Sequence, residues 1–206
     1  MPLSFPTNRR DIHTRTIDVR AFARDDGLFD VEARLIDRKP FAFWRIAQPT
    51  ATPAGEPLHD ISIRLTLDKT LTVRAIEASS DTTPFGICKE AEATLEPLVG
   101  ERLVSGWSSK VKTLLRGNRS CTHLMEMLIT MATPALQGIR GLARERKLDD
   151  TKLGPGKLDS CYAYSSERAV IKTYWPEHYR ESQSSRPAGD GGSSPLHPDQ
   201  TEKLKS

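Results

Sequence analysis

Hydrophobic and polar residues alternate with a period of two over residues 12–24 and 29–36. This alternation is typical of strands that bury one face and expose the other. Between the two stretches, Asp25-Asp26-Gly27 is typical of a tight turn, because Gly adopts the positive φ that such turns need. We therefore predict a β-hairpin whose first strand carries His13, Arg15 and Ile17 on one face.

The same alternation returns over residues 59–67 and 71–75, with a turn at Asp68-Lys69-Thr70. His59 begins the apolar face of the first of these strands, whereas Asp60 and Arg64 fall on the opposite face. Three prolines and a glycine within residues 47–57 predict a loop between the two hairpins. Four strands joined in this order predict an antiparallel meander.

The period changes to a helical one after residue 86. Helices are predicted over residues 88–99, 107–115 and 121–131, and Pro134 is expected to kink or restart the last of them. A final hairpin is predicted over residues 159–175. The fold class is therefore α+β: an antiparallel sheet of four to six strands built from hairpins, covered on one face by about three helices.

The length of 206 residues suits one domain with appendages. We predict an N-terminal arm over residues 1–10, a single α+β domain over 11–179, and a disordered tail over 180–206. The tail is rich in Ser, Pro, Gly and charge and has no aromatic residue, so it buries too little apolar surface to offset its ordering entropy.

Charge and cysteine content restrict the expected partners. A net charge of +3 without a basic stripe argues against nucleic acid. No apolar run reaches the ~20 residues of a membrane span, and the first residues lack the apolar region of a secretory signal. The three cysteines are widely spaced, which favours reduced thiols and a cytoplasmic location.

No standard catalytic or nucleotide-binding motif is present, so a site must assemble from distant segments. His13 and His59 each stand near a strand end on the inward face. Two such imidazoles can bind one metal ion or bracket one substrate. Alternatively, each ring satisfies a backbone carbonyl at the rim of the sheet.

Cys121 and His123 lie at the start of a predicted helix, where the helix dipole lowers the pKa of a thiol. Both reach one site only if Cys121 occupies the cap position, because residues i and i+2 diverge around a helix. A zinc or iron site would then take its ligands from His13, His59, Cys121 and His123, and we predict His13 and His59, with Cys121 or His123, within about 8 Å of one centre. Alternatively, Cys121 is a buried hydrophobe and His123 a surface residue.

Further candidates follow from residue type. His59, His123 and Asp60 are candidate acid–base catalysts, and Arg15, Arg64 and Trp107 are candidate contacts for an aromatic substrate. Structural alternatives exist for each: Asp60 can bond a loop, arginines can lie flat on a solvated sheet, and Trp107 can fill the core. Cys161, in the last predicted hairpin, can line the same cavity or be buried.

Five segments carry a family resemblance and together span about residues 10–175: IHTRTIDVRAFARDDGLFDVEARLIDRKPF, GEPLHDISIRLTLD, EASSDTTPFGIC, SCTHLMEML and LDSCYAY. Through them the chain resembles a bacterial family catalogued as a domain of unknown function. The resemblance implies a link with bacterial breakdown of lignin-derived aromatics, including a phenylcoumaran γ-formaldehyde lyase activity. The family often has Cys-Pro where this chain has Cys88-Lys89.

Three functional hypotheses follow. The first is a small cytoplasmic, metal-assisted lyase that cleaves a C–C or C–O bond in a lignin-derived or other small aromatic molecule. The second is a non-catalytic ligand-binding or assembly protein, homo-oligomers included, in which the histidines and cysteines are structural. The third is a metal-free enzyme with Cys121 as the nucleophile.

Overall fold

The computed structural model describes residues 4–46, 48–145 and 157–181. The chain divides into two compact units, Met1–Asp150 and Thr151–Ser206. This division falls inside the region 11–179 that the sequence analysis treats as one domain. From residue 182 on, the predicted tail lies outside the described residues.

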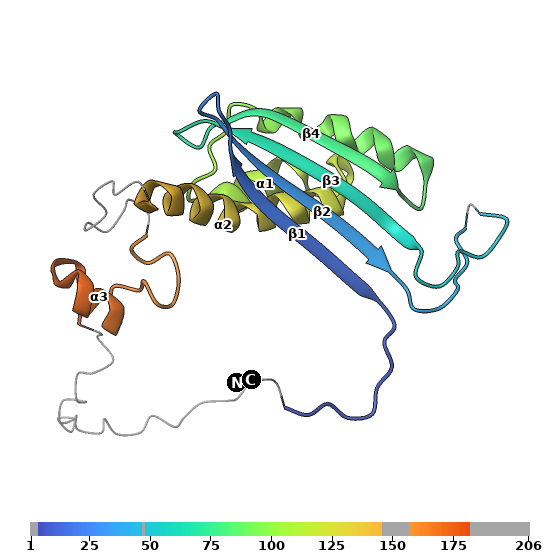
Figure 1. The fold of residues 1–206 in the computed structure, drawn as a ribbon, viewed down its shortest axis with the longest axis horizontal. Helices are drawn as coiled ribbons and strands as arrows, with labels where there is room; N and C mark the ends of the chain where they lie inside the picture. Colours follow the sequence, from blue (N-terminus) through green and yellow to red (C-terminus); the bar gives the residue numbers. More distant parts are fainter. Residues whose placement is uncertain (1–3, 47, 146–156, 182–206) are drawn as a thin grey trace, which may run out of the picture. The chain divides into compact units, whose positions relative to one another are not determined.

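The first unit is built on a four-stranded antiparallel sheet, as predicted (Figure 1). In spatial order, the strands of this sheet are β1 (Thr14–Ala23), β2 (Phe29–Arg38), β3 (Pro57–Leu67) and β4 (Val73–Thr82). In the turn between β1 and β2, Gly27 has the predicted positive φ of 82°, and the backbone N–H of Arg24 donates to the carbonyl of Leu28 (3.0 Å). The predicted meander is therefore confirmed.

Helices pack against one face of this sheet (Figure 1). They are the 3-10 helix η1 (Gly86–Leu98) and the α-helices α1 (Trp107–Leu115) and α2 (Thr122–Glu145). The short 3-10 turn η2 (Gly117–Arg119) follows α1 and has no buried residue. Pro134 does not restart α2, because Met131 and Ala135 on either side of it are fully buried and hold the helix on the core. Among the described helices, none is both long enough and apolar enough to cross a membrane.

The core lies between the sheet and α1 and α2 and follows the predicted parity. Ile61, Ile63 and Leu65 of β3 are at most 2% exposed. On β2, the inward residues Val31 and Leu35 are fully buried as well. The outward face of the sheet carries alternating charges instead, which is typical of an antiparallel sheet with one solvated face.

The second unit differs from the prediction. Residues 169–174 form a short helix, α3 (Ala169–Tyr174), followed by the 3-10 turn η3 (Pro176–His178), so the predicted final hairpin is wrong. The reason is local: the Asp159 carboxylate accepts the backbone N–H of Ser166 (2.8 Å), which folds residues 159–166 into a loop. Cys161 lies in this loop and is exposed.

Candidate metal centre

One row of residues crosses three strands at the end of the sheet where β1 and β3 begin and β2 ends. The register pairs Arg15 of β1 with Asp37 of β2, and Asp37 with His59 of β3. All three share the parity of the inward apolar residues, so their side chains lie on the face that the helices cover. The strand register alone thus brings a cation, a carboxylate and an imidazole side by side.

Asp37 is the centre of this row, and its side chain is only 1% exposed. Arg15 donates to both carboxylate oxygens, from Nε to Oδ1 (2.7 Å) and from Nη2 to Oδ2 (2.8 Å). The ring nitrogens Nδ1 of His59 and Nε2 of His13 lie 2.9 Å from Oδ2 and 3.2 Å from Oδ1. Burial alone would raise the pKa of Asp37, but Arg15 and His59 outweigh it and hold that pKa at about 2. Asp37 is therefore a carboxylate at physiological pH.

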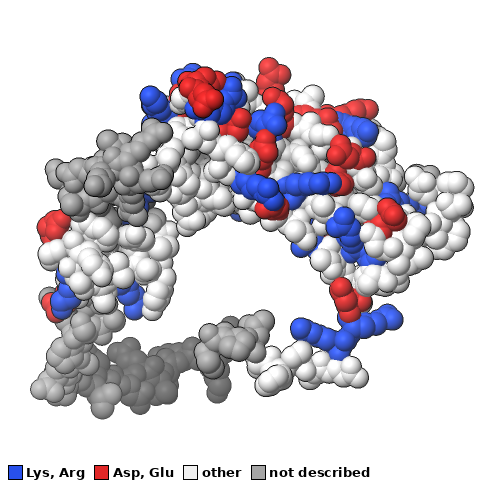
Figure 2. Space-filling model, in the orientation of Figure 1, with Lys and Arg blue, Asp and Glu red and all other residues white. Residues whose placement is uncertain are grey.

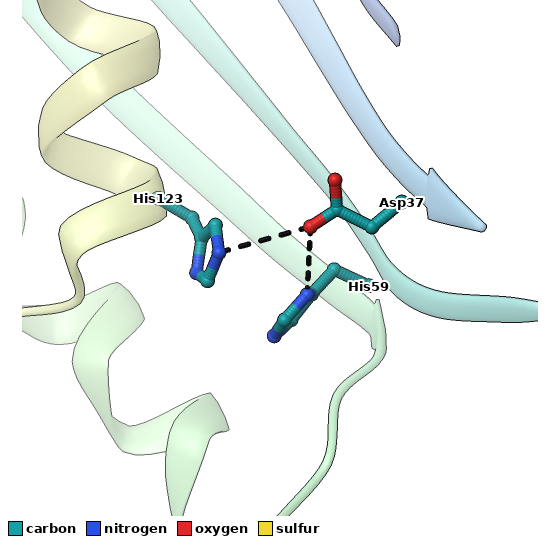
Figure 3. Close-up of side chains that lie close together, drawn as sticks. All are labelled: Asp37, His59 and His123. Carbon is teal, nitrogen blue, oxygen red and sulfur yellow. Dashed lines mark hydrogen bonds and ion pairs between the residues drawn. The ribbon is translucent and has the colours of Figure 1, made fainter. Parts of the chain in front are cut away.

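Helix α2 adds His123 to the same carboxylate (Figure 3). Its Nε2 lies 3.8 Å from Oδ2 of Asp37, and its ring stands 4.0 Å from the His59 ring, centroid to centroid. One turn along the helix, Glu126 accepts a hydrogen bond from Nη1 of Arg15 (2.7 Å). This contact ties the first turns of α2 to β1, so the helix presents its N-terminal end to the site.

Asp37, His59 and His123 each offer one ligand atom, and these atoms lie within 4.8 Å of one another. Ligands that bind one ion with bonds of about 2.1 Å lie roughly 3–4 Å apart, which is the spacing of both histidine nitrogens from Oδ2 of Asp37. Burial lowers the pKa of His59 below its ordinary value despite the hydrogen bond to Asp37. The neutral imidazole that a metal needs is therefore the favoured form.

Residues 13–137 match the model of a family described as a protein of unknown function, DUF2889. The chain belongs to this family. Comparisons with curated proteins and with solved structures found no match. Every residue of the cluster lies within the DUF2889 region, whereas the segment over 158–164 that also carried the resemblance lies outside it.

The DUF2889 region brings together four residues that the sequence analysis proposed as metal ligands. His59 and His123 are two of the three residues whose ligand atoms lie within 4.8 Å of one another. His13 contacts Asp37, and Cys121 contacts His123. Helix α2 begins at Thr122, so Cys121 occupies the cap position. This is the position from which Cys121 and His123 can reach the same site. The Sγ of Cys121 lies 3.6 Å from Nδ1 of His123. Cys121 therefore contacts the ring of His123 on the side away from Asp37.

The surroundings of Cys121 lower the pKa of its thiol. Burial would raise its pKa, but the hydrogen bond with His123 and the backbone N–H groups of Leu124 and His123 together lower it. A thiolate accepts the Nδ1–H of His123 and so directs Nε2 of that ring towards Asp37.

Three of the predicted catalytic and substrate-binding residues, Asp60, Arg64 and Trp107, are not part of this cluster. Asp60 lies on the opposite face of the sheet, as its parity requires, and accepts two hydrogen bonds from Arg34 (2.8 and 2.7 Å). Arg64 is on that face too and pairs with Glu32. Trp107 is buried in the core, where its Nε1–H donates to the carbonyl of Leu128. Cys161 belongs to the second unit of the chain.

The sequence reasoning missed Asp37 and Glu126. The signal for Asp37 was present, because the alternation that turns Val31, Ala33 and Leu35 inward also turns Asp37 inward. An aspartate on an otherwise buried face needs partners, and antiparallel pairing supplies them from the neighbouring strands. Glu126 follows His123 by three residues, which is the spacing of neighbours on one helix face.

Proposed function

We propose that Asp37, His59 and His123 bind one divalent zinc or iron ion, and that the protein is a metal-dependent lyase acting on a small aromatic catabolite. The observation that carries the metal site is the set of two imidazoles and one carboxylate whose ligand atoms lie within 4.8 Å of one another. Three protein ligands leave coordination positions open for water or substrate, which is the usual arrangement in catalytic sites.

The surrounding residues support this proposal, because metal ligands are usually held by a second layer of hydrogen bonds. Arg15 fixes the Asp37 carboxylate through two donors. Cys121 contacts the second nitrogen of the His123 ring. Each proposed ligand other than His59 thus has a partner that sets its orientation, and His59 is half-buried against His123.

A lyase step is compatible with this arrangement. A metal held by these residues would supply a Lewis acid for a substrate hydroxyl, and His13 would accept the hydroxyl proton. The C–O bond then becomes a carbonyl, and the adjacent C–C bond breaks, leaving its electron pair on the carbon next to the aromatic ring. That electron pair then either takes up a proton or forms a C=C bond that expels a phenolate from the neighbouring carbon, and formaldehyde leaves when the hydroxyl is a primary alcohol. The aromatic substrate class rests on the family resemblance of the sequence.

Metal binding is tested by titrating metal-free protein with Zn²⁺, and with Fe²⁺ under anaerobic conditions, in a calorimeter. We expect one equivalent to bind, and His59→Ala and His123→Ala to weaken binding by at least about tenfold. His178→Ala is the matched control, because His178 lies in the second unit and its nearest acidic partner is Glu177. Equal binding by all three variants would contradict the proposed ligand set.

The reaction is tested separately by incubating metal-loaded protein with phenolic dimers that carry a primary alcohol and measuring released formaldehyde. His59→Ala and His123→Ala should abolish the release. A protein that binds the metal and releases no product from any dimer contradicts the lyase and leaves the metal site standing.

A structural role is the second candidate function, and one observation favours it. Within 3.8 Å, Oδ1 of Asp37 already has two nitrogen partners and Oδ2 has three. On this reading the cluster fastens β1, β2, β3 and α2 together without a metal. It predicts that His59→Ala lowers the unfolding temperature of protein kept in a chelator, whereas a pure metal site predicts a loss only when metal is present.

A further inference from the structure

Among the residues that the structure describes, the backbone groups on the outer edge of β1 have no partner. The hydrogen bond from Arg24 N–H to Leu28 C=O fixes the phase of the ladder, because paired residues that exchange hydrogen bonds recur at every second position. Even-numbered residues of β1 therefore bond to β2, and the N–H and C=O groups of the odd-numbered residues, such as Ile17, Val19 and Ala21, point away from the sheet. Across the described part of the chain, no further backbone hydrogen bond involves residues 15–23.

The other edge of the sheet is protected. On β4, the N–H of Val73 donates to the carbonyl of Glu101, and the carbonyl of Val73 accepts from Gly100. Near the end of β4, the N–H of Ser80 donates to the carboxylate of Glu92 (2.7 Å). The β1 edge lacks three of the usual devices against pairing: it is ten residues long, has no proline, and pairs with β2 without a bulge. Its inward-pointing charge, Arg15, lies near the strand end and is engaged by Asp37. An edge of this kind is a template for another strand.

Charge on β1 selects the partner. We propose that β1 pairs antiparallel with β1 of a second copy of this chain, about a two-fold axis at Val19. In that register Asp18 stands opposite the partner's Arg20, twice by symmetry, in the closely spaced type of pair. Moving the axis to Asp18 or to Arg20 sets like charges opposite each other, which is destabilising.

The proposed register also continues a pattern already present on the outward face of the sheet. Charges alternate there along one row of paired residues, Glu77, Arg64, Glu32 and Arg20, and Figure 2 shows positive and negative side chains interspersed over the strands. The partner's Asp18 and Arg34 extend this alternation by two more positions. The side chains of Asp18 and Arg20 are 56% and 69% exposed, so both are accessible to a second copy.

The unpaired backbone groups of β1 favour the same register as its charges. With the axis at Val19, odd residues meet odd residues, so the outward N–H and C=O groups of Val19 bond to the same groups of the partner's Val19. Ile17 then faces the partner's Ala21 on the helix-covered side, where Ile17 and Val19 are only half-buried in one copy. One register thus satisfies the unpaired backbone, pairs the charges and covers the apolar edge.

The test is sedimentation equilibrium of the full chain and of three charge variants. The wild type should sediment at twice the chain mass of 23.0 kDa. Asp18→Arg should raise the dimer dissociation constant at least about fivefold by creating like-charge pairs, and Asp18→Arg combined with Arg20→Asp should restore dimerisation. Glu77→Arg, an equally drastic change on the opposite edge strand, should leave the dimer intact.

A monomer at all concentrations overturns the proposal, and so does a dimer that resists Asp18→Arg or is broken by Glu77→Arg. Circular dichroism checks that each variant is folded. Where a variant does not fold, amide hydrogen exchange of the wild type decides: the N–H groups of Ile17, Val19 and Ala21 should become more protected as the protein concentration rises. Protection that is independent of concentration overturns the proposal.

Discussion

Asp37 connects residues from three strands and a helix, because its two oxygens lie within 3.8 Å of Arg15 and three histidines. Asp37→Asn keeps the size of the side chain but removes its charge and turns an amide N–H₂ towards the donors of Arg15. We expect the free energy of unfolding to fall by about 1–3 kcal/mol. Urea denaturation measures the change.

Asp60→Asn is the matched control for this prediction. Asp60 also accepts two hydrogen bonds from one arginine, but it does so on the outward face with Arg34, whose side chain is 56% exposed. Solvent screens this pair, so the variant should cost at most about 1 kcal/mol. Equal losses in the two variants would mean that the less exposed arginine and the histidine partners of Asp37 add nothing to its contribution.

Strand parity predicted part of the cluster at the residue scale. It placed His13, Arg15 and His59 on the inward face, and it placed Asp60 and Arg64 outside. Parity does not give the register between strands, so the sequence did not reveal that Asp37 stands between Arg15 and His59. The contact between His59 and His123 joins residues from a strand and a helix that are far apart in the chain, and it depends on packing that no local pattern encodes.

The turn between β3 and β4 is held by one carboxylate. Hydrogen bonds from the Thr70 hydroxyl, the Thr72 N–H and Arg74 lower the pKa of Asp68 well below its ordinary value of 3.8, although slight desolvation opposes them. A lowered folded-state pKa means that this stabilisation is complete above pH 3.8 and is lost as the pH falls further. Asp68→Asn cannot titrate, so its deficit relative to wild type in urea unfolding should shrink between about pH 6 and about pH 2.5.

Two glycines of α2 provide a matched pair at the element scale. A Cβ at Gly138 would lie 3.1 Å from the Cβ of Ala21 on β1, whereas a Cβ at Gly141 would meet nothing within 4 Å. Gly141→Ala should therefore raise the free energy of unfolding by about 0.5–1 kcal/mol, the ordinary helix-propensity gain. Gly138→Ala should gain less, because β1 must shift to accept the methyl group. Equal gains would show that α2 and β1 are not closely packed at this point.

The four strands of the first unit were predictable because two signals agreed in each hairpin. Alternation and turn residues together fixed the hairpins, and Asp25-Asp26-Gly27 adopts the turn expected for its sequence. In residues 169–175 the apolar run is too short to distinguish a strand from a helix by period. Hydrogen bonds such as that between Asp159 and Ser166 determine the local structure there, and sequence patterns do not reveal such bonds.

At the scale of the whole molecule, the cluster and the DUF2889 match lie within one of the two units, since residues 13–126 contain every cluster residue. A chain that ends at Asp150 should therefore bind Zn²⁺ with the stoichiometry of the full chain. Binding to the folded state alone raises the free energy of unfolding by about 2.7 kcal/mol at a free metal concentration of 100 times the dissociation constant. Thermal unfolding of the shortened chain with and without Zn²⁺ should show this stabilisation and should lose it in His123→Ala. A shortened chain that folds but gains no stability from Zn²⁺, while the full chain does, would place part of the metal site in the second unit.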